Sequence, residues 1–159
     1  MYKGKTIGVV IPAHNEETQI SRVIETMPDY VDLMIIIDDK STDKTIKVVQ
    51  EIQKTSDRIE LIQHETNRGV GGAIATGYKF ARDQKYDVAV VMAGDGQMDP
   101  EDLPHLVDKI IEKDYDYVKG NRLIHSDVKS TMPRYRLLGN AVLTILTKFA
   151  TGYFFLMDP

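Results

Sequence analysis

Short apolar segments alternate with longer amphipathic ones along most of the chain. Four of the short segments, at residues 6–11, 33–38, 59–63 and 87–93, are predicted to be β-strands, and "YDYVKG" at 115–120 is predicted to be a fifth. Strands that are apolar at nearly every position are buried on both faces, which is typical of a parallel sheet covered by helices. The pattern therefore predicts an α/β fold, a three-layer sandwich with a mainly parallel central sheet.

Helical periodicity fills the segments between these strands. Four helices are predicted there: one capped by Asn15, one opened by Ser41 or Thr42, one within 67–84, and one over 99–113. The last has the clearest start, because Asp99 stands at the N-cap and Pro100 at the first helical position. Strands joined by helices in this order fit the predicted sandwich.

A further amphipathic segment lies near the end of the printed sequence. "MPRYRLLGNAVLTILTKFATGYFF" carries a broad apolar stripe, flanked by Arg134, Arg136 and Lys148. It is interpreted either as a helix that packs on a core or as an interfacial helix that meets a lipid surface. The sequence stops soon afterwards at "GYFFLMDP", and we expect it to be part of a longer protein.

Composition narrows the classes of function. The 159 residues are 42% apolar and 28% charged, with a net charge of −4, which argues against a general nucleic-acid binder. The absence of cysteine excludes disulfides and thiolate metal sites, and it suits a reducing compartment. No apolar run reaches the roughly 18 residues that cross a bilayer, and the run at residues 7–11 is too short for a signal peptide.

Polar residues stand where the predicted strands one, two, four and five end. Ligands of open α/β sheets bind beyond the carboxyl ends of the strands, so these positions are candidates for a site. His14 and Glu16 follow the first strand, and Asp38 and Asp39 follow the second. Each pair has a structural alternative, since solvated polar residues and carboxylates are also common where helices begin.

The stretch "VVMAGDGQMDP" is the strongest single signal. Asp95 and Gln97 are two residues apart at a strand end, and Gly94 and Gly96 permit a tight backbone around them. Carboxylate and amide oxygens are hard ligands that suit Mg²⁺ or Mn²⁺. An acidic loop that leads into a capped helix is the alternative, but it leaves Asp95 unexplained.

The spacing of residues argues against several common kinds of site. The glycines of "NRGVGGAIATG" fit neither the dinucleotide-binding fingerprint nor the P-loop fingerprint. The four histidines are scattered without a zinc-binding spacing. No G-x-S-x-G elbow is present, so the common esterase arrangement is also excluded.

Six segments taken together resemble the family-2 glycosyltransferases of GT-A fold, in particular the polyprenyl-phosphate (dolichol-phosphate) mannosyl- and glucosyltransferases. In order they are "VVIPAHNEE", "IIIDDKSTDKT", "NRGVGGAIATGYKFA", "VVMAGDGQMDPEDLP", "KGNRL" and "MPRYRLLGN". The resemblance implies a Rossmann-like GT-A domain over residues 1–159 that binds a nucleotide sugar and lacks its C-terminal acceptor-side part.

The resemblance also implies a role for individual residues. Pro12, His14 and Glu16 match positions that hold the nucleotide base and ribose, and Ile37 and Asp39 match further nucleoside contacts. His14 stands where a tyrosine is commoner in the family, and an imidazole is still able to stack on a base.

The fourth segment matches the family's metal motif. Asp95 and Gln97 would bind the cation, and Ala93 and Gly94 would lie against the donor. Ala93 is a departure, because many relatives carry the first aspartate of the motif there.

Two arginines match basic residues of the family. Arg122 and Arg136 correspond to residues near the diphosphate and the acceptor phosphate. The resemblance assigns them, together with Asp95, to the catalytic group.

The implied reaction moves a sugar, mannose or glucose, from a GDP- or UDP-linked donor to a polyprenyl phosphate with inversion. Mg²⁺ or Mn²⁺ is the implied cofactor, and the expected location is the cytoplasmic face of a membrane. Two alternatives stay open. One is transfer to a saccharide hydroxyl, for which Asp158 is the candidate base. The other is a nucleotide-sugar-binding module without catalysis, of which Ala93 would be a symptom.

Overall fold

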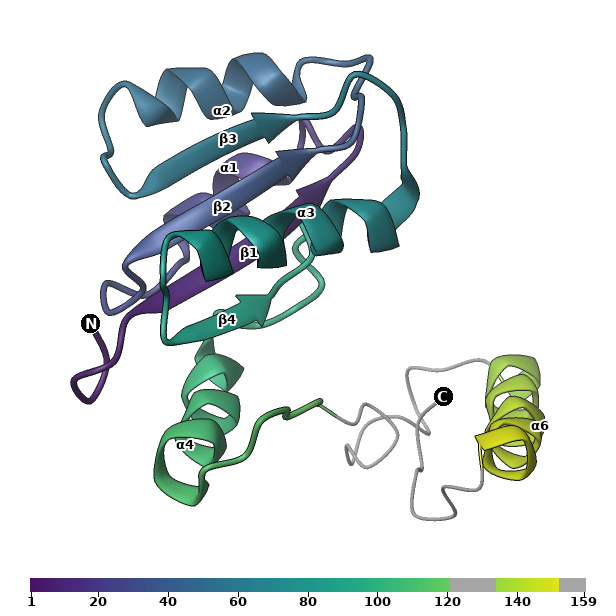
Figure 1. Cartoon of the computed structure of the whole chain (residues 1–159). Helices are drawn as coiled ribbons and strands as arrows, with labels where there is room; N and C mark the ends of the chain where they lie inside the picture. Colours follow the sequence, from purple (N-terminus) through teal and green to yellow (C-terminus); the bar gives the residue numbers. More distant parts are fainter. Residues whose placement is uncertain (121–133, 152–159) are drawn as a thin grey trace. The chain divides into compact units, whose positions relative to one another are not determined.

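A computed structural model describes residues 1–120 and 134–151 of the chain (Figure 1). The chain divides into two compact units, Met1–Asp116 and Tyr117–Pro159. The first unit contains a four-stranded sheet of order β3-β2-β1-β4, in which every neighbouring pair is parallel. Its strands are β1 (Ile7–Ala13), β2 (Leu33–Asp38), β3 (Ile59–Gln63) and β4 (Val88–Val91).

Helices cover both faces of this sheet. They are α1 (Ile20–Glu25), α2 (Thr45–Gln53), α3 (Gly69–Asp83) and α4 (Leu103–Lys113), with a short 3₁₀ turn η1 (Pro100–Asp102) before α4. Alternate residues of β1 enter different cores. Val9 and Ile11 pack with residues of α1, α2 and α4, whereas Val10 packs with residues of α3. The predicted three-layer α/β sandwich is therefore confirmed, with α3 on one face of the sheet and α1, α2 and α4 packed against the other (Figure 1).

The predicted fifth strand at 115–120 is wrong. These residues have no strand structure, and the side chains of Tyr115 and Tyr117 are 52% and 73% exposed. The alternation of tyrosine and aspartate resembles a strand in sequence, but a strand also requires a neighbour that buries one of its faces. Helix α4 ends instead at Lys113, and its C-cap residue Asp114 adopts a left-handed φ of 55°.

Two predicted helix starts are also wrong. Helix α1 begins at Ile20 rather than after Asn15, and α2 begins at Thr45, beyond Ser41 and Thr42. Those polar residues lie in the two preceding loops and bond to each other, as described below. Strand β1 continues past residue 11 to Ala13, since proline lacks only the donor and the Pro12 carbonyl still accepts from Gly94 N–H. The predicted cap at Asp99 is confirmed, since its side chain accepts from Glu101 N–H at 2.9 Å.

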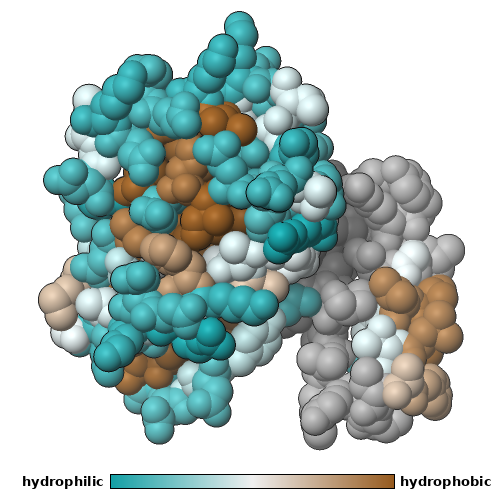
Figure 2. All heavy atoms as spheres, turned by 45° about the horizontal axis from the view of Figure 1, so that its top comes forward, coloured by the Kyte–Doolittle hydropathy of each residue, from teal (hydrophilic) through white to brown (hydrophobic). Residues whose placement is uncertain are grey.

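The second unit contains helix α6 (Arg134–Thr151), at the position of the predicted amphipathic segment. Its exposed large apolar residues are Val142, Leu143, Ile145, Leu146 and Phe149. Figure 2 shows brown, apolar surface on this helix. Within the described residues, no helix combines the length and the apolar character that a membrane crossing requires.

Helix α3 packs unusually closely on the sheet at Gly77. A β-carbon at this position would lie only 2.2 Å from Cγ1 of Val10, which is fully buried in β1. Real β-carbons do not approach other carbons so closely, so the absence of a side chain sets the distance between α3 and the sheet. That distance in turn determines where the beginning of α3 lies relative to the strand ends.

We expect Gly77→Ala to destabilise the protein by about 1–3 kcal/mol, because overpacking would outweigh the better helix propensity of alanine. Chemical denaturation followed by circular dichroism measures the free energy of unfolding.

Gly71→Ala is the matched control. Gly71 lies in the same helix, but a β-carbon there would meet nothing within 4 Å. This variant should be neutral or more stable than wild type by up to about 1 kcal/mol. Equal stability of the two variants would contradict the close packing.

Candidate active site

The carboxyl ends of the four parallel strands lie along one edge of the sheet. The loops that leave this edge begin at His14 after β1, Asp39 after β2, His64 after β3 and Met92 after β4. Because the strands are parallel, residues far apart in sequence become neighbours here. The predicted site residues of all these loops therefore share one region of the first unit.

Asp39 is the centre of the hydrogen bonds at this edge. Its side chain is almost completely buried, at 3% exposure, and its Oδ1 accepts from His64 Nδ1 at 2.7 Å and from Arg68 N–H at 2.8 Å. Its main chain donates to Ala13 O and accepts from His14 Nδ1, both at 2.8 Å. Asp39 thus connects the ends of β1, β2 and β3 with the start of α3.

Burial and hydrogen bonding act on the Asp39 carboxyl in opposite directions. Burial by itself would raise the pKa, because a charged group loses hydration. The hydrogen bonds from Arg68 N–H and from His64 outweigh burial, so the pKa of Asp39 lies below its ordinary value. The side chain is therefore a buried carboxylate at neutral pH.

His64 is a residue that reasoning from the sequence missed. It is buried and bridges two elements, since its Nδ1 lies 2.7 Å from Asp39 Oδ1 and its Nε2 lies 2.9 Å from Thr76 Oγ1 of α3. The available signal was its position, directly after the predicted strand at 59–63. The strand-end argument that pointed to His14 applies equally to His64.

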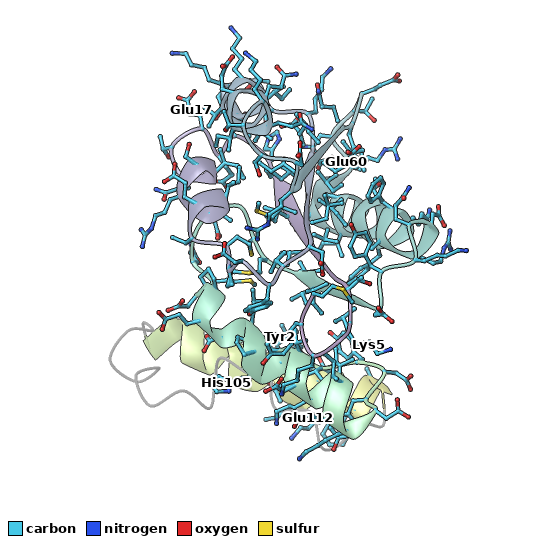
Figure 3. The ribbon with its side chains drawn as sticks, turned by 90° about the vertical axis from the view of Figure 1, so that its left-hand side faces the viewer. Tyr2, Lys5, Glu17, Glu60, His105 and Glu112 are labelled. Atoms are coloured by element: carbon cyan, nitrogen blue, oxygen red, sulfur yellow. The ribbon has the colours of Figure 1, made fainter. Side chains whose placement is uncertain are left out.

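The loops after β1 and β2 are joined by side chains that bond to the opposite backbone. Asn15 has a left-handed φ of 58°, and its Oδ1 accepts from Thr42 N–H at 2.8 Å. In return, Ser41 Oγ accepts from Asn15 N–H at 2.9 Å, and Glu17 Oε2 accepts from Lys44 N–H at 2.9 Å. These contacts place the polar residues of "HNEE" and "DKSTDK" against each other near the starts of α1 and α2, where Figure 3 labels Glu17.

Thr45 is the buried part of this loop pair. It is fully buried, its Oγ1 accepts from Glu16 N–H at 2.8 Å, and the same hydroxyl donates to Asp43 Oδ1 at 2.6 Å. The backbone at Glu16 is thereby fixed by a side chain from α2. Glu16 is thus held at the edge of the sheet by a residue 29 positions away.

Glu16 and Asp95 face the same region from different loops. Burial raises the pKa of Glu16 above its ordinary value, and the negative charge of Asp95 raises it further. The loops after β1 and β4 also meet through their backbones, since Gly94 N–H donates to Pro12 O at 3.2 Å.

The loop after β4 bends at its glycines. Gly96 has a left-handed φ of 70°, and a β-carbon at Gly94 would lie 3.1 Å from Pro12 O of β1. Asp95 Oδ1 accepts from Gln97 N–H at 3.0 Å, which orients the carboxylate inside the loop. Ala93 is half-buried at the start of this turn and contributes no side-chain oxygen.

The chemistry of these donors fits a hard divalent cation. Asp95 supplies a carboxylate, Gln97 supplies an amide oxygen, and the nearby charge of Glu16 would favour a positive ion. Among the described residues, no group of three or more histidines and carboxylates could hold a metal by itself. A cation here would need most of its ligands from water or from a bound phosphate.

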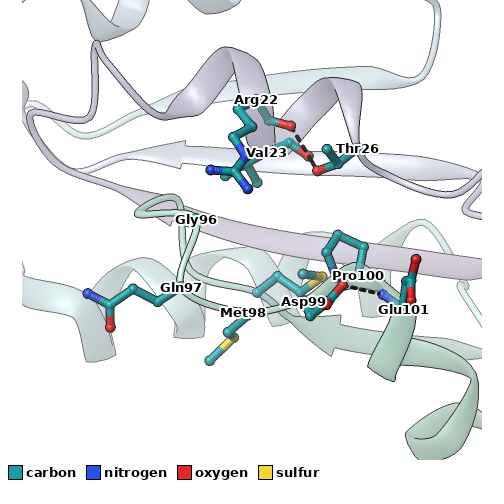
Figure 4. A pocket seen from close by; sticks show the side chains of 10 residues that line it. Arg22, Val23, Thr26, Gly96, Gln97, Met98, Asp99, Pro100 and Glu101 are labelled. Carbon is teal, nitrogen blue, oxygen red and sulfur yellow. Dashed lines mark hydrogen bonds between the residues drawn. The ribbon is translucent and has the colours of Figure 1, made fainter. Parts of the chain in front are cut away.

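A pocket of about 480 Å³ lies between α1 and the loop after β4 (Figure 4). Its lining includes Arg22 and Val23 of α1 and residues 96–101. Figure 4 shows the Gln97 side chain extending away from Arg22. None of the residues predicted to contact the nucleoside lines this pocket, so we do not assign the donor to it.

The remaining predicted residues lie in different environments. Pro12 is half-buried and pairs with Ile37 across β1 and β2, and Ile37 is fully buried against α3. Arg136 belongs to α6 in the second unit. Arg122 lies outside the described residues, as does Asp158, the candidate base of the alternative reaction. The roles of all predicted site residues stay predictions.

Comparison with known sequences identifies the family. The sequence model described as "Glycosyl transferase family 2" matches residues 8–158, nearly the whole chain. The chain belongs to glycosyl transferase family 2. The predicted resemblance, made from six segments, is confirmed.

Two of the similar sequences carry names that include a dolichol phosphate. The UDP-N-acetylglucosamine–dolichyl-phosphate N-acetylglucosaminyltransferase of Methanococcus voltae is 34% identical over 163 residues, which cover 94% of this chain and 65% of that protein. The dolichol-phosphate mannosyltransferase of Pyrococcus furiosus is 29% identical and is matched over 83% of this chain and 37% of its own length. The chain thus spans less than two thirds of these family members.

Two solved structures share the fold. Glucosyl-3-phosphoglycerate synthase from Mycobacterium tuberculosis, in complex with Mn²⁺, UDP and glucosyl-3-phosphoglycerate, is 28% identical with a TM-score of 0.54, over 67% of this chain and 40% of that one. A mannosyltransferase from Pyrobaculum calidifontis, in complex with GDP-Man and Mn²⁺, is 21% identical with a TM-score of 0.57, over 67% of this chain and 32% of that one. The fold is therefore GT-A, as predicted.

We expect Thr45→Val to lower the free energy of unfolding by about 1–3 kcal/mol, because it removes the acceptor of Glu16 N–H and one of the two donors to Asp43 Oδ1 at nearly constant volume. Thermal and urea denaturation measure the change.

Thr42→Val serves as the control for this substitution. Thr42 is exposed, and its short bond to Asn15 uses the backbone N–H, which valine keeps. Its stability should stay within about 0.5 kcal/mol of wild type. If Thr45→Val is equally harmless, the buried hydroxyl does not hold the two loops together.

Proposed function

We propose that this protein transfers a hexose or N-acetylhexosamine from a nucleoside-diphosphate donor to a polyprenyl phosphate, with inversion at the anomeric carbon. The observation that carries the proposal is the convergence of His14, Glu16, Asp39 and Asp95 at one edge of a GT-A sheet. The names of the relatives from M. voltae and P. furiosus support the choice of a lipid phosphate as acceptor.

The donor nucleoside would bind at the ends of β1 and β2. His14 is exposed, and its ring is held by the Asp39 carbonyl, so one face of the imidazole is able to stack on a base. Glu16 is half-buried beside it and would accept from ribose hydroxyl groups. Asp39 is too deeply buried to contact the nucleoside over a large area. It would act mainly by ordering His14 and the start of α3.

The diphosphate would lie toward the loop after β4. Asp95 and Gln97 would hold Mg²⁺ or Mn²⁺, which when bound supplies positive charge to the departing diphosphate. Arg122 and Arg136 are proposed to add positive charge at the diphosphate and the acceptor phosphate, as in the family that the sequence resembles. Ala93 contributes no oxygen, so metal binding should depend on the nucleotide.

The chemical step is a single displacement. An oxygen of the acceptor phosphate forms a bond to the anomeric carbon while the bond from that carbon to the diphosphate oxygen breaks. The electron pair leaves with the nucleoside diphosphate, and the configuration at the carbon inverts. Because a phosphate monoester is largely anionic at neutral pH, no side chain needs to remove a proton from it.

A lipid acceptor requires access to a membrane surface, which we place on the cytoplasmic side. Val142, Ile145, Leu146 and Phe149 follow the i, i+3, i+4, i+7 spacing of one helix face, and each is about half or more exposed in α6. Such a face is able to enter the headgroup region of a bilayer.

The test of the function is a panel of UDP- and GDP-linked sugars measured by thermal shift and calorimetry, with and without Mn²⁺. A ligand that binds only the folded chain raises its melting temperature. We expect nucleotide and Mn²⁺ to strengthen each other's binding by the same factor, about 5–150-fold. Asp95→Asn should abolish this enhancement, because it removes the charged ligand.

Asp99→Asn is the matched control for Asp95→Asn, since it changes a carboxylate of the same loop while asparagine still caps η1. It should retain the full Mn²⁺ enhancement. Retention by Asp95→Asn as well would assign that carboxylate to loop structure alone. Absence of binding by every nucleotide sugar would refute the donor site. Donor binding without sugar transfer by the whole protein would favour the binding-module alternative.

We expect the chain to float with vesicles that contain anionic lipid, because the apolar face of α6 would contact the membrane. The double substitution Leu146→Asn and Phe149→Asn should reduce the bound fraction strongly, because each buried side chain contributes about 1.5–3 kcal/mol. Thr144→Asn, on the opposite side of α6, replaces one polar residue by another and should leave flotation unchanged. No flotation of wild type at any lipid composition would exclude the interfacial role.

A further inference from the structure

His64 is a buried polar residue that has no role in the proposed reaction. It is 7% exposed and follows β3 directly, and its backbone N–H donates to Asp38 O at 2.9 Å. An imidazole at such a depth must satisfy both ring nitrogens or lose their hydration without compensation. The hydrogen-bond partners of its two ring nitrogens therefore indicate the role of His64.

Both ring nitrogens have partners, and the two partners belong to different elements. Nδ1 lies 2.7 Å from Oδ1 of Asp39 at the end of β2, and Nε2 lies 2.9 Å from Oγ1 of Thr76 in α3. Thr76 Oγ1 also lies 3.1 Å from Gly72 O in the same helix, so its single hydroxyl proton is shared between that carbonyl and His64 Nε2. The ring is thus held at both ends and is unable to turn freely.

The direction of the first bond follows from charge. Asp39 is a carboxylate with only acceptor oxygens, so the proton between the two groups belongs to His64 Nδ1. The same oxygen of Asp39 accepts from Arg68 N–H at the start of α3. Helix α3 therefore reaches Asp39 by two routes, one through its first residues and one through Thr76 and His64.

We propose that His64 is a positioning residue of the donor-nucleoside site, which acts by holding Asp39, and through it His14, in the orientation that the nucleoside needs. This inference rests on the proposed function. His64 itself does not touch the nucleoside. Thr76 supports it by fixing the far side of the ring, which ties the geometry of the site to the position of α3.

Two substitutions separate the two bonds. The amide nitrogen of asparagine stands about where Nδ1 stands, so His64→Asn keeps the bond to Asp39. The longer His64→Gln places its amide near Nε2 and loses the bond to Asp39. The probes are UDP and GDP, each titrated into the 159-residue chain with Mn²⁺ by calorimetry, with the melting temperature recorded in parallel.

We expect His64→Gln to weaken binding of the nucleotide that wild type prefers by about tenfold or more, the usual effect of a lost hydrogen bond to a charged group. His64→Asn should restore most of the affinity. The double variant of His64→Gln and Asp39→Asn should bind no more weakly than the weaker single variant, because a residue that acts through another gives non-additive effects.

The control is His105→Gln, the same change at an exposed position of α4 (Figure 3), which should bind as wild type does. If His64→Gln does not fold, Thr76→Val removes the far anchor and should weaken binding less strongly. Nitrogen chemical shifts of the free protein should show His64 protonated at Nδ1, with a clear change in Asp39→Asn.

Three results would overturn the inference. They are wild-type affinity in His64→Gln, additive losses in the double variant, and an unprotonated Nδ1 in the free protein. The nitrogen measurement needs no ligand, so it judges the His64–Asp39 contact even if the protein binds no nucleotide. Failure of wild type to bind UDP or GDP would refute the donor site, and with it the role of His64 in that site.

Discussion

A charged carboxylate buried at the end of a central strand is the constraint around which this sheet edge is organised. Removing Asp39 from water is costly unless donors replace its hydration. Those donors come from His64 after β3 and from the backbone of Arg68 before α3. Both donors lie in the loop between β3 and α3, so their bonds to one carboxylate hold this loop against the end of β2.

The apolar interior and the polar edge have separate tasks. The continuous aliphatic runs of the strands are buried against the helices. The close contact between Gly77 and Val10 sets how near α3 approaches the sheet. Hydrogen bonds then decide the details at the carboxyl edge, where Thr45 and Asn15 join the two neighbouring loops. The interior supplies most of the stability, and the edge supplies the geometry that a ligand would meet.

Membership of glycosyl transferase family 2 gives this geometry a chemical context. A family-2 site needs a place for a nucleoside, a means to balance the diphosphate charge, and access for an acceptor. The described edge offers candidates for the first two in His14 and Asp95. A cation at Asp95 and Gln97, as proposed, would take its remaining ligands from water and the donor phosphates, because Ala93 supplies no side-chain oxygen.

The sequence by itself determined the layered α/β fold, the four strands and the cap at Asp99, because these follow from local periodicity and from contacts between near neighbours. It also indicated the family, through six motifs whose order along the chain is visible in the sequence. The tertiary structure decided that Asn15 bonds to Thr42 instead of capping α1, and that residues 115–120 form no strand. It also decided that the His64 ring forms a hydrogen bond with Asp39, a residue 25 positions away. A periodic pattern records which residues are buried, but the partner of a buried polar group depends on which loops the parallel sheet brings together, and only the folded chain fixes that.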